Sequence, residues 1–145
     1  MFNRFPVFRK TGARITHISD DQHLIKLRLP LNRSTKNYVG TIYGGTMYSA
    51  LDGILMVMFI RLLGKDYIVW DKSGRIEYLK PGRGMLYADV EIPEDELAFI
   101  RSKLTEQEKL EKEYTLEWRA EDGELCCRVH KLLYFRPRKR SPVSP

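Results

Sequence analysis

The feature that most constrains this chain is a long apolar run at residues 41–60. The run contains no Lys, Arg or Glu, and its only formal charge is Asp52, in a chain that is 30% charged. The adjacent Gly44 and Gly45 can open a helix with exposed backbone N–H groups, and Gly64 can end it. The sequence therefore predicts one long apolar helix that carries a single carboxylate.

The carboxylate of Asp52 is unusual in a predicted apolar helix. At 3.6 residues per turn, Gly45, Ser49 and Asp52 would share one face of this helix. Burying an unpaired carboxylate is costly, so Asp52 either has good hydrogen-bond partners or serves a reaction. A membrane span is disfavoured, since Asp52 would be expensive in lipid and the sequence has no second span. A central helix wrapped by other elements fits the run better.

Length and composition predict one globular domain at residues 1–136. The chain has 145 residues, 43% of them hydrophobic and 11% aromatic, which is enough for an independent core. No apolar signal segment opens the sequence, so we expect a cytoplasmic protein. The formal charge of +6 is concentrated near the end, and residues 137–145 are predicted to form a basic, Pro-rich tail. The last fifteen residues of the chain contain five cations: Lys131, Arg136, Arg138, Lys139 and Arg140.

Other common site types find no support in the sequence. Cys126 and Cys127 are adjacent in a strand-like run, which suggests neither an intramolecular disulfide nor a metal site. His17, His23 and His130 are scattered without ligand spacing. No zinc-finger, RRM or helix-turn-helix pattern supports nucleic-acid binding. We expect no metal, no cofactor and no nucleic-acid partner.

The sequence before and after the central helix predicts mainly β-strands. Alternating or β-branched runs predict strands at 15–19, 24–31, 67–79, 86–92, 114–119 and 125–135. Gly74 is expected at a bulge, and the runs 67–79 and 86–92 are expected to pair as a hairpin. Pro93 and the acids after it predict a second helix through Leu104. This is an α+β pattern with about six antiparallel strands and no βαβ alternation.

The segment from Asn37 to Asp52, with Tyr43, Gly44 and Gly45 inside it, resembles the signature of the hotdog-fold acyl-thioester hydrolases of the phenylacetate-degradation type. In that superfamily an Asn, a His-Gly-Gly turn and a helix Asp recur. With Val69-Trp-Asp71 and Tyr78-Leu-Lys-Pro81 added, residues 12–136 resemble an uncharacterised bacterial branch of it. The resemblance implies a sheet wrapped around the central helix, and paired subunits that share each active site.

The resemblance also implies roles for individual residues. Asn37 would help to place the substrate carbonyl or the attacking water, and the Gly44 N–H would hold the thioester oxygen. Asp52 of the facing subunit would be base or nucleophile, and Asp71 occupies a position where relatives often orient water. Tyr43 departs from the family, which usually has His there.

Several further residues are candidates for substrate binding. Tyr43, Gly45 and Ser49 lie near the helix start, and basic side chains near the Pro81 turn could hold the phosphates of coenzyme A. The basic candidates are Lys72, Arg75, Lys80 and Arg83.

Three classes of function stay open. The first is a thioesterase acting on acyl-CoA or an acyl-carrier thioester, and the second is a non-catalytic acyl-thioester or lipid-binding hotdog protein. The third is a dimeric interaction module. The resemblance implies a homodimer in any of these cases, or a homotetramer built as a dimer of dimers.

Overall fold

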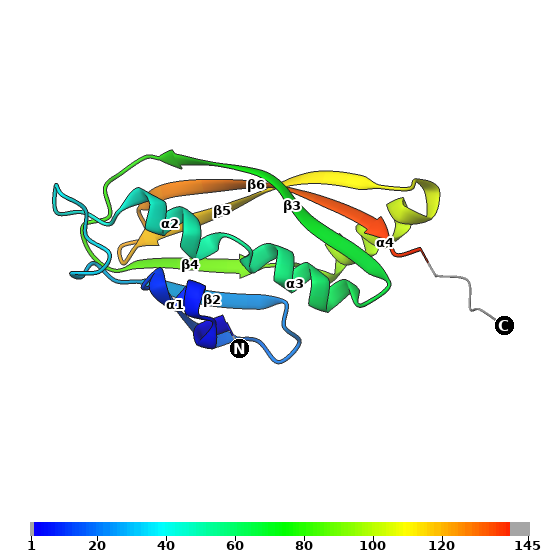
Figure 1. Cartoon of the computed structure of the whole chain (residues 1–145), viewed down its shortest axis with the longest axis horizontal. Coiled ribbons are helices and arrows are strands. Elements are labelled where there is room, and N and C mark those ends of the chain that lie inside the picture. Colours follow the sequence, from blue (N-terminus) through cyan, green and yellow to red (C-terminus); the bar gives the residue numbers. More distant parts are fainter. Residues whose placement is uncertain (1, 140–145) are drawn as a thin grey trace.

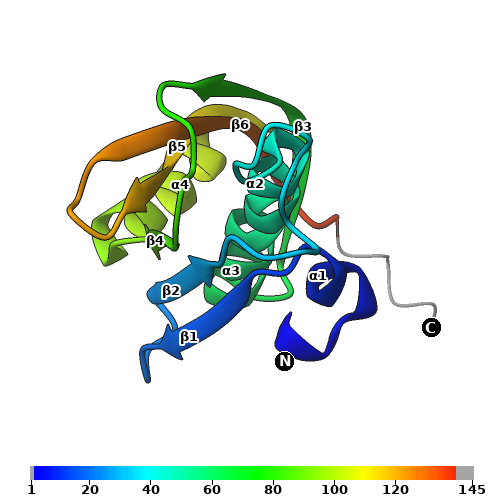
Figure 2. The ribbon, with the colours of Figure 1, turned by 90° about the vertical axis from the view of Figure 1, so that its left-hand side faces the viewer.

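The computed structural model of the protein describes residues 2–139 and contains one antiparallel sheet of six strands. Their order across the sheet is β1-β2-β4-β5-β6-β3. The strands are β1 (Arg14–Ile18), β2 (Leu24–Leu29), β3 (Tyr67–Tyr78), β4 (Leu86–Glu91), β5 (Leu110–Ala120) and β6 (Leu125–Pro137). The sheet curves around a central helical segment, as Figures 1 and 2 show. The expected α+β hotdog architecture is confirmed.

The central segment consists of two helices, α2 (Gly44–Leu51) and α3 (Ile54–Leu63). They are separated at Asp52 and Gly53, where Asp52 has an extended ψ of 130° and Gly53 has a φ of +75°. The left-handed conformation of Gly53 is one that side-chain-bearing residues rarely adopt. The long central helix is therefore interrupted at the carboxylate, and Asp52 lies at a helix end instead of within a continuous helical face.

The core lies between the central helices and the concave face of the sheet. Trp118 of β5, Phe59 of α3 and Phe135 of β6 are fully buried, and the rings of Phe59 and Phe135 meet edge to face at 5.0 Å. Trp118 also donates a 2.9 Å hydrogen bond from Nε1 to the carbonyl of Met47 in α2. Alternating inward residues, such as those of β4, supply the rest of this packing.

By length and composition alone, Gly44–Leu63 could cross a membrane, with a mean hydropathy of 1.5. Core helices of globular proteins pass the same test, and here the sheet covers this segment along one side. Five of the ten residues of α3 are buried inside the protein. The core thus accounts for part of the apolar character of the run, of which 44% is buried.

The predicted hairpin between the runs 67–79 and 86–92 is wrong. β3 pairs with β6, while β4 pairs with β2 and β5. The connecting residues 79–85 cross the end of the sheet, where the Ile42 N–H bonds the carbonyl of Gly82 and the Leu79 N–H bonds that of Cys126. β3 and β6 have 12 and 13 residues, so they match each other far better than β3 matches the six-residue β4.

Gly74 is not the bulge that the sequence suggested. The irregularity in the pairing of β3 with β6 lies between Asp71 and Ser73. A Cβ atom on Gly74 would collide with the hydroxyl of Tyr48 in α2. Glycine leaves room here for the side chain of Tyr48, which reaches the strand at this position.

The remaining elements lie at the margins of the sheet. η1 (Phe2–Arg4) and α1 (Pro6–Lys10) form an N-terminal arm whose Phe8 joins the core. α4 (Glu94–Glu106) packs against β5 and β6. Pro137, expected to begin the basic tail, ends β6, and the Arg138 N–H bonds the carbonyl of Asp66. Residues 140–145 of the predicted tail lie outside the described residues.

Candidate functional site

The start of α2 opens into a pocket of about 660 Å³. Tyr43 precedes the helix and gives it no side-chain cap, so the N–H groups of Gly44 and Gly45 have no partner within residues 2–139. The first N–H groups of a helix carry partial positive charge and bind developing anions. The pocket is lined by Asn37, Gly44, Gly45, Met47, Tyr78 and Lys80, among others.

Asn37 shapes this pocket by closing the loop before α2. Its Nδ2 donates to Thr41 Oγ1 at 2.9 Å, and its Oδ1 accepts from the Thr41 N–H at 2.9 Å. The same loop is closed on the backbone by the Asn37 N–H and the carbonyl of Thr41. Asn37 therefore stabilises this loop, and its second Nδ2 hydrogen remains available to bind a ligand.

A second groove, of about 720 Å³, runs along the exposed side of α2 to Asp52. One wall is the N-terminal arm, with Phe2, Phe5 and Phe8. The other wall belongs to α2, the following junction and the start of α3. Its lining includes Tyr43, Gly45, Thr46, Ser49, Asp52 and Val57. Tyr43 and Gly45 line both cavities, so the two are neighbours at the start of the helix.

Asp52 is not the isolated carboxylate that the apolar run suggested. Its side chain is 51% exposed, and its Oδ1 accepts a 2.5 Å hydrogen bond from the ammonium of Lys131. Because α2 ends at Leu51, the carboxylate projects from the helix junction. Within one chain, Asp52 is thus a half-exposed, ion-paired group, and Lys131 is the hydrogen-bond partner that the sequence left unidentified.

Asp71 on β3 lies on the far side of the same lysine. Its side chain is 22% exposed, and its Oδ1 is 3.4 Å from the Lys131 ammonium. This contact is electrostatic, because Oδ1 is buried and meets no hydrogen-bond geometry with the described residues. Burial raises the pKa of Asp71, Lys131 partly offsets this effect, and the charge of Asp52 raises the pKa further.

Lys131 is the functional candidate that the sequence reading missed, since it was counted toward the basic end of the chain. It lies within β6, and its side chain is only 3% exposed. Burial alone would lower its pKa, but the hydrogen bond to Asp52 and the charges of both aspartates reverse this effect and raise it. The signal was the alternation of the strand: Lys131 falls in the inward row with Cys127, Val129, Leu133 and Phe135.

The four basic candidates for phosphate binding do not converge. Lys72 pairs with Glu111 at 2.7 Å, and Lys80 pairs with Glu124 while also lining the first pocket. Arg83 lines a second depression around the Pro81 turn, which Lys80 also lines. Among these, Lys80 alone lies at the pocket beside the helix start.

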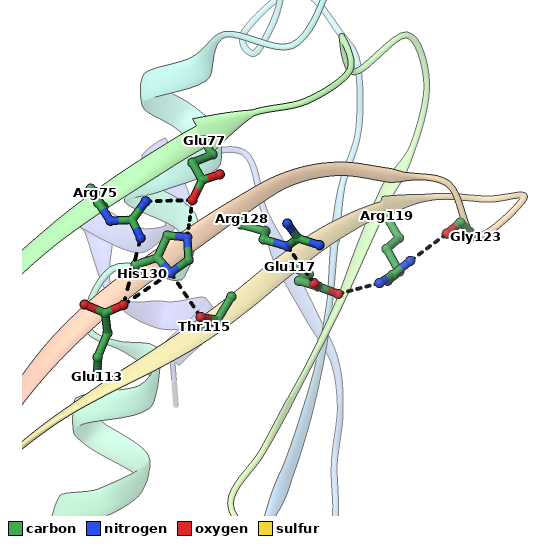
Figure 3. A network of polar contacts seen from close by, with 9 residues as sticks. All are labelled: Arg75, Glu77, Glu113, Thr115, Glu117, Arg119, Gly123, Arg128 and His130. Atoms are coloured by element: carbon green, nitrogen blue, oxygen red, sulfur yellow. Dashed lines mark hydrogen bonds and ion pairs between the residues drawn. The ribbon is translucent and has the colours of Figure 1, made fainter.

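Arg75 lies on the outward face of the sheet, away from α2. Its guanidinium contacts Glu77 at 2.6 Å, and His130 bonds the same carboxylate through Nε2 (Figure 3). Neighbouring strand residues point to opposite faces, and Lys131 next to His130 faces the helix. Arg75 therefore belongs to an outer polar network, which removes it from the predicted phosphate mouth.

The thiols and histidines show no sign of a metal centre in the part of the chain that the structure describes. No group of three or more His, Cys, Asp or Glu side chains there could hold a metal ion. Cys126 and Cys127 are buried and free, and burial raises the pKa of Cys127 to about 12. Both thiols stay protonated near neutral pH, so neither is a ready nucleophile.

These features define a hotdog-fold protein with a polar cluster at a break in its central helix. The chain belongs to the family described as "Domain of unknown function (DUF4442)", whose model matches residues 1–135. No curated protein matches its sequence.

Solved structures share the fold at low sequence identity. A protein of unknown function and probable thioesterase from Pseudomonas aeruginosa superposes with a TM-score of 0.79 and 17% identity, over 90% of this chain and 86% of that one. A thioesterase from Haemophilus influenzae has a TM-score of 0.68 and 14% identity, with coverage of 97% and 89%. A protein of unknown function from Chlorobaculum tepidum has a TM-score of 0.72 and 16% identity, with coverage of 94% and 89%.

Proposed function

We propose that the protein is a thioesterase that hydrolyses an acyl group carried by coenzyme A or by an acyl-carrier protein in the cytoplasm. Its fold is shared with structures described as thioesterases, and that likeness supports the class of reaction. The substrate class comes from the resemblance of the segment from Asn37 to Asp52. The proposal needs no cofactor.

The observation that carries the proposal is the groove that joins Gly45 to Asp52. One end of the groove offers backbone donors at a helix start, the other offers a carboxylate, and phenylalanines of the N-terminal arm form an apolar wall. A thioester substrate has the matching parts, a polar carbonyl and an apolar acyl chain. This combination favours acyl-thioester chemistry over binding of a wholly polar ligand.

The chemistry then follows from these groups. Asp52 would accept a proton from water as that water attacks the carbonyl carbon, or would attack the carbon itself. The N–H groups of Gly44 and Gly45 would stabilise the negative charge that develops on the carbonyl oxygen. When water attacks, collapse of the intermediate breaks the C–S bond, and the proton taken by Asp52 passes to the leaving thiolate, which gives a thiol and a carboxylic acid. When Asp52 attacks, collapse releases the thiolate and leaves an acyl-aspartyl anhydride, which water then hydrolyses to the carboxylic acid.

A single chain does not bring these two groups to one carbonyl. The eight residues of α2 rise about 1.5 Å each, so Gly44 and Asp52 lie roughly 12 Å apart along the helix. We therefore propose that two copies pair, and that Asp52 of one copy faces the helix start of the other. Asp71 would help to orient water, and Tyr43 would donate a hydrogen bond in the position of the family His.

A second candidate is a non-catalytic acyl-thioester or lipid-binding protein. It is favoured by the 2.5 Å hydrogen bond between Lys131 and Asp52, because this contact already occupies one oxygen of the carboxylate. It is also favoured by Tyr43, since a phenol donates a hydrogen bond well but is a poor base near neutral pH.

The experiment that separates the two candidates is a turnover panel. Purified protein is incubated with short-chain, long-chain and aromatic acyl-CoA thioesters and acyl-carrier thioesters, and free thiol is measured against time. Release of thiol above the rate without protein supports the thioesterase. Calorimetric binding of the same compounds without any thiol release supports the binding protein.

A further inference from the structure

One buried cation bridges two carboxylates that come from different elements. The ammonium of Lys131 in β6 lies 2.5 Å from Oδ1 of Asp52 at the helix junction and 3.4 Å from Oδ1 of Asp71 in β3. It also donates a 3.3 Å hydrogen bond to the hydroxyl of Tyr48 in α2. With all three groups ionised, the cluster carries one net negative charge.

Packing does not explain why a lysine stands at this position. Its neighbours in the inward row of β6 are buried and apolar, among them Val129 and Leu133. Removing ions from water is costly, and well-packed apolar residues of similar volume often replace a buried ion pair without loss of stability. The chain thus carries a charge where an apolar side chain would suit the core, which points to a use for that charge.

The two carboxylates are held unequally. Asp52 receives the hydrogen bond from Lys131 through Oδ1, while its Oδ2 has no partner among residues 2–139 and the side chain lines the groove. Asp71 is more buried, and its Oδ1 has only the longer electrostatic contact. Two other titratable groups lie near the cluster: Tyr48 of α2, whose hydroxyl accepts a hydrogen bond from Lys131, and Lys10 of α1, which lines the same groove as Asp52.

We propose that Lys131 is a positioning residue, which holds Asp52 with its second oxygen toward the groove and couples Asp52 to Asp71 through one shared cation. The inference rests on the proposed function for its catalytic meaning. The coupling itself is a property of three side chains in the resting protein. It can therefore be tested without turnover.

The coupling makes a directional prediction. Without the lysine, Asp52 and Asp71 would share a site with no cation between them, and like charges disfavour double ionisation. In Lys131→Met, the carboxyl of Asp71 should keep its proton to higher pH, because the cation that lowers the pKa of Asp71 is gone. In Lys131→Arg the cation is kept, and the titration should move much less.

The experiment is a carbon-13 NMR titration of the Asp side-chain carboxyl signals in the full chain. Asp52→Asn and Asp71→Asn assign the two signals, and Lys112→Met is the matched control. Lys112 lies on the neighbouring strand β5, and its ammonium forms a 2.7 Å ion pair with Glu96 of α4. The expected result is an upward shift in Lys131→Met, absent in Lys112→Met and largely restored in Lys131→Arg.

A second measurement covers the case in which Lys131→Met does not fold. Asp52→Asn leaves the cation of Lys131 to Asp71 alone and removes a like charge, so the Asp71 carboxyl should titrate at lower pH than in the parent. An unmoved Asp71 titration in a folded Lys131→Met, or in Asp52→Asn, would overturn the inference.

Turnover adds the catalytic test. If the parent releases thiol, the acidic limb of the kcat profile should move up in Lys131→Met together with the carboxyl titration, and Lys131→Arg should restore it. A shifted titration with an unmoved acidic limb would overturn the positioning role. If the parent releases no thiol from any thioester, the proposed function fails, while the carboxyl titration still decides on the coupling.

Discussion

The ammonium of Lys131 hydrogen-bonds Asp52 at 2.5 Å, although 79 positions separate the two residues in the chain. The contact ties β6 to the junction between α2 and α3. Gly53 ends the helical path there with a positive φ, and this break turns the carboxylate toward the groove instead of the core. One lysine and one glycine together explain how a charged residue is tolerated in the most apolar segment of the chain.

Asp52→Asn is expected to abolish thioester hydrolysis and leave the fold intact. The amide keeps an oxygen that can accept the hydrogen bond from Lys131, but it cannot act as base or nucleophile. Thiol release and thermal unfolding are measured on the same preparation. Asp89→Asn is the control, because Asp89 forms an exposed 3.1 Å pair with Lys26 on the sheet. Full activity in Asp52→Asn would move the chemistry to another residue.

The protein is expected to be at least a two-fold dimer. Gly44 and Asp52 of one chain are too far apart to act on one carbonyl, whereas pairing of two chains could bring them together. Static light scattering should give twice or four times the chain mass of 17.1 kDa. A stable monomer that retains turnover would contradict both the assembly and the shared site.

The strand alternation predicted much of the fold because half-buried strands repeat every two residues. β4 is an example: Leu86, Ala88 and Val90 face inward, while Tyr87 and Asp89 face outward. The helix after Pro93 was also correctly predicted from its acidic first turn. These signals are local, so a single sequence is enough to detect them.

The errors arose where contacts distant in sequence decide the outcome. Nothing in the local pattern of β3 says whether it pairs with β4 or with β6, since either partner could satisfy its backbone groups. The role of Lys131 depends on Asp52 and Asp71, which reach it from other elements. The break at Gly53 was equally hidden, because glycine inside an apolar helical pattern is tolerated at a modest cost.

Trp118→Phe should destabilise the protein by about 2–4 kcal/mol. Trp118 is fully buried, and its indole N–H donates to the carbonyl of Met47. The smaller ring leaves a cavity and removes the hydrogen bond that ties β5 to α2. The free energy of unfolding is measured by urea denaturation.

Trp70→Phe is the control for that experiment, because Trp70 is 62% exposed in the chain. Exposed substitutions of this kind usually change stability by less than about 0.5 kcal/mol. Equal losses of stability in the two variants would show that burial of Trp118 is not the cause.

Asp71→Asn should become more stable relative to the parent as pH rises above the ordinary Asp pKa of about 3.9. Burial raises the pKa of Asp71 in the folded protein, so the native state binds this proton more tightly than the unfolded state does. The parent therefore loses stability as pH rises from the ordinary value through the raised one, and the amide removes that loss.

The measurement is urea denaturation of the parent and Asp71→Asn from pH 3 to pH 7. The difference in free energy of unfolding, variant minus parent, should increase with pH across the acid range. Asp89→Asn, an exposed and ion-paired site, should show no such increase. A difference that falls with pH would mean that Lys131 stabilises the ionised form of Asp71 by more than burial disfavours it.

Tyr43→Phe should reduce turnover roughly tenfold to a hundredfold, about 1.4 to 3 kcal/mol, with little effect on stability. Tyr43 is 59% exposed, caps α2 only through its backbone and lines both cavities at the helix start. Its hydroxyl has no hydrogen bond within residues 2–139, so it is free to donate to a substrate carbonyl or to water. Tyr87→Phe on the partly exposed outer face of β4 is the matched control.

A second variant, Tyr43→His, introduces the residue that the family usually has at this position. Retained turnover in Tyr43→His would mean that a hydrogen-bond donor is sufficient, whereas a large gain in turnover would mean that the parent lacks a base. Unchanged turnover in Tyr43→Phe would show that the hydroxyl takes no part in the reaction.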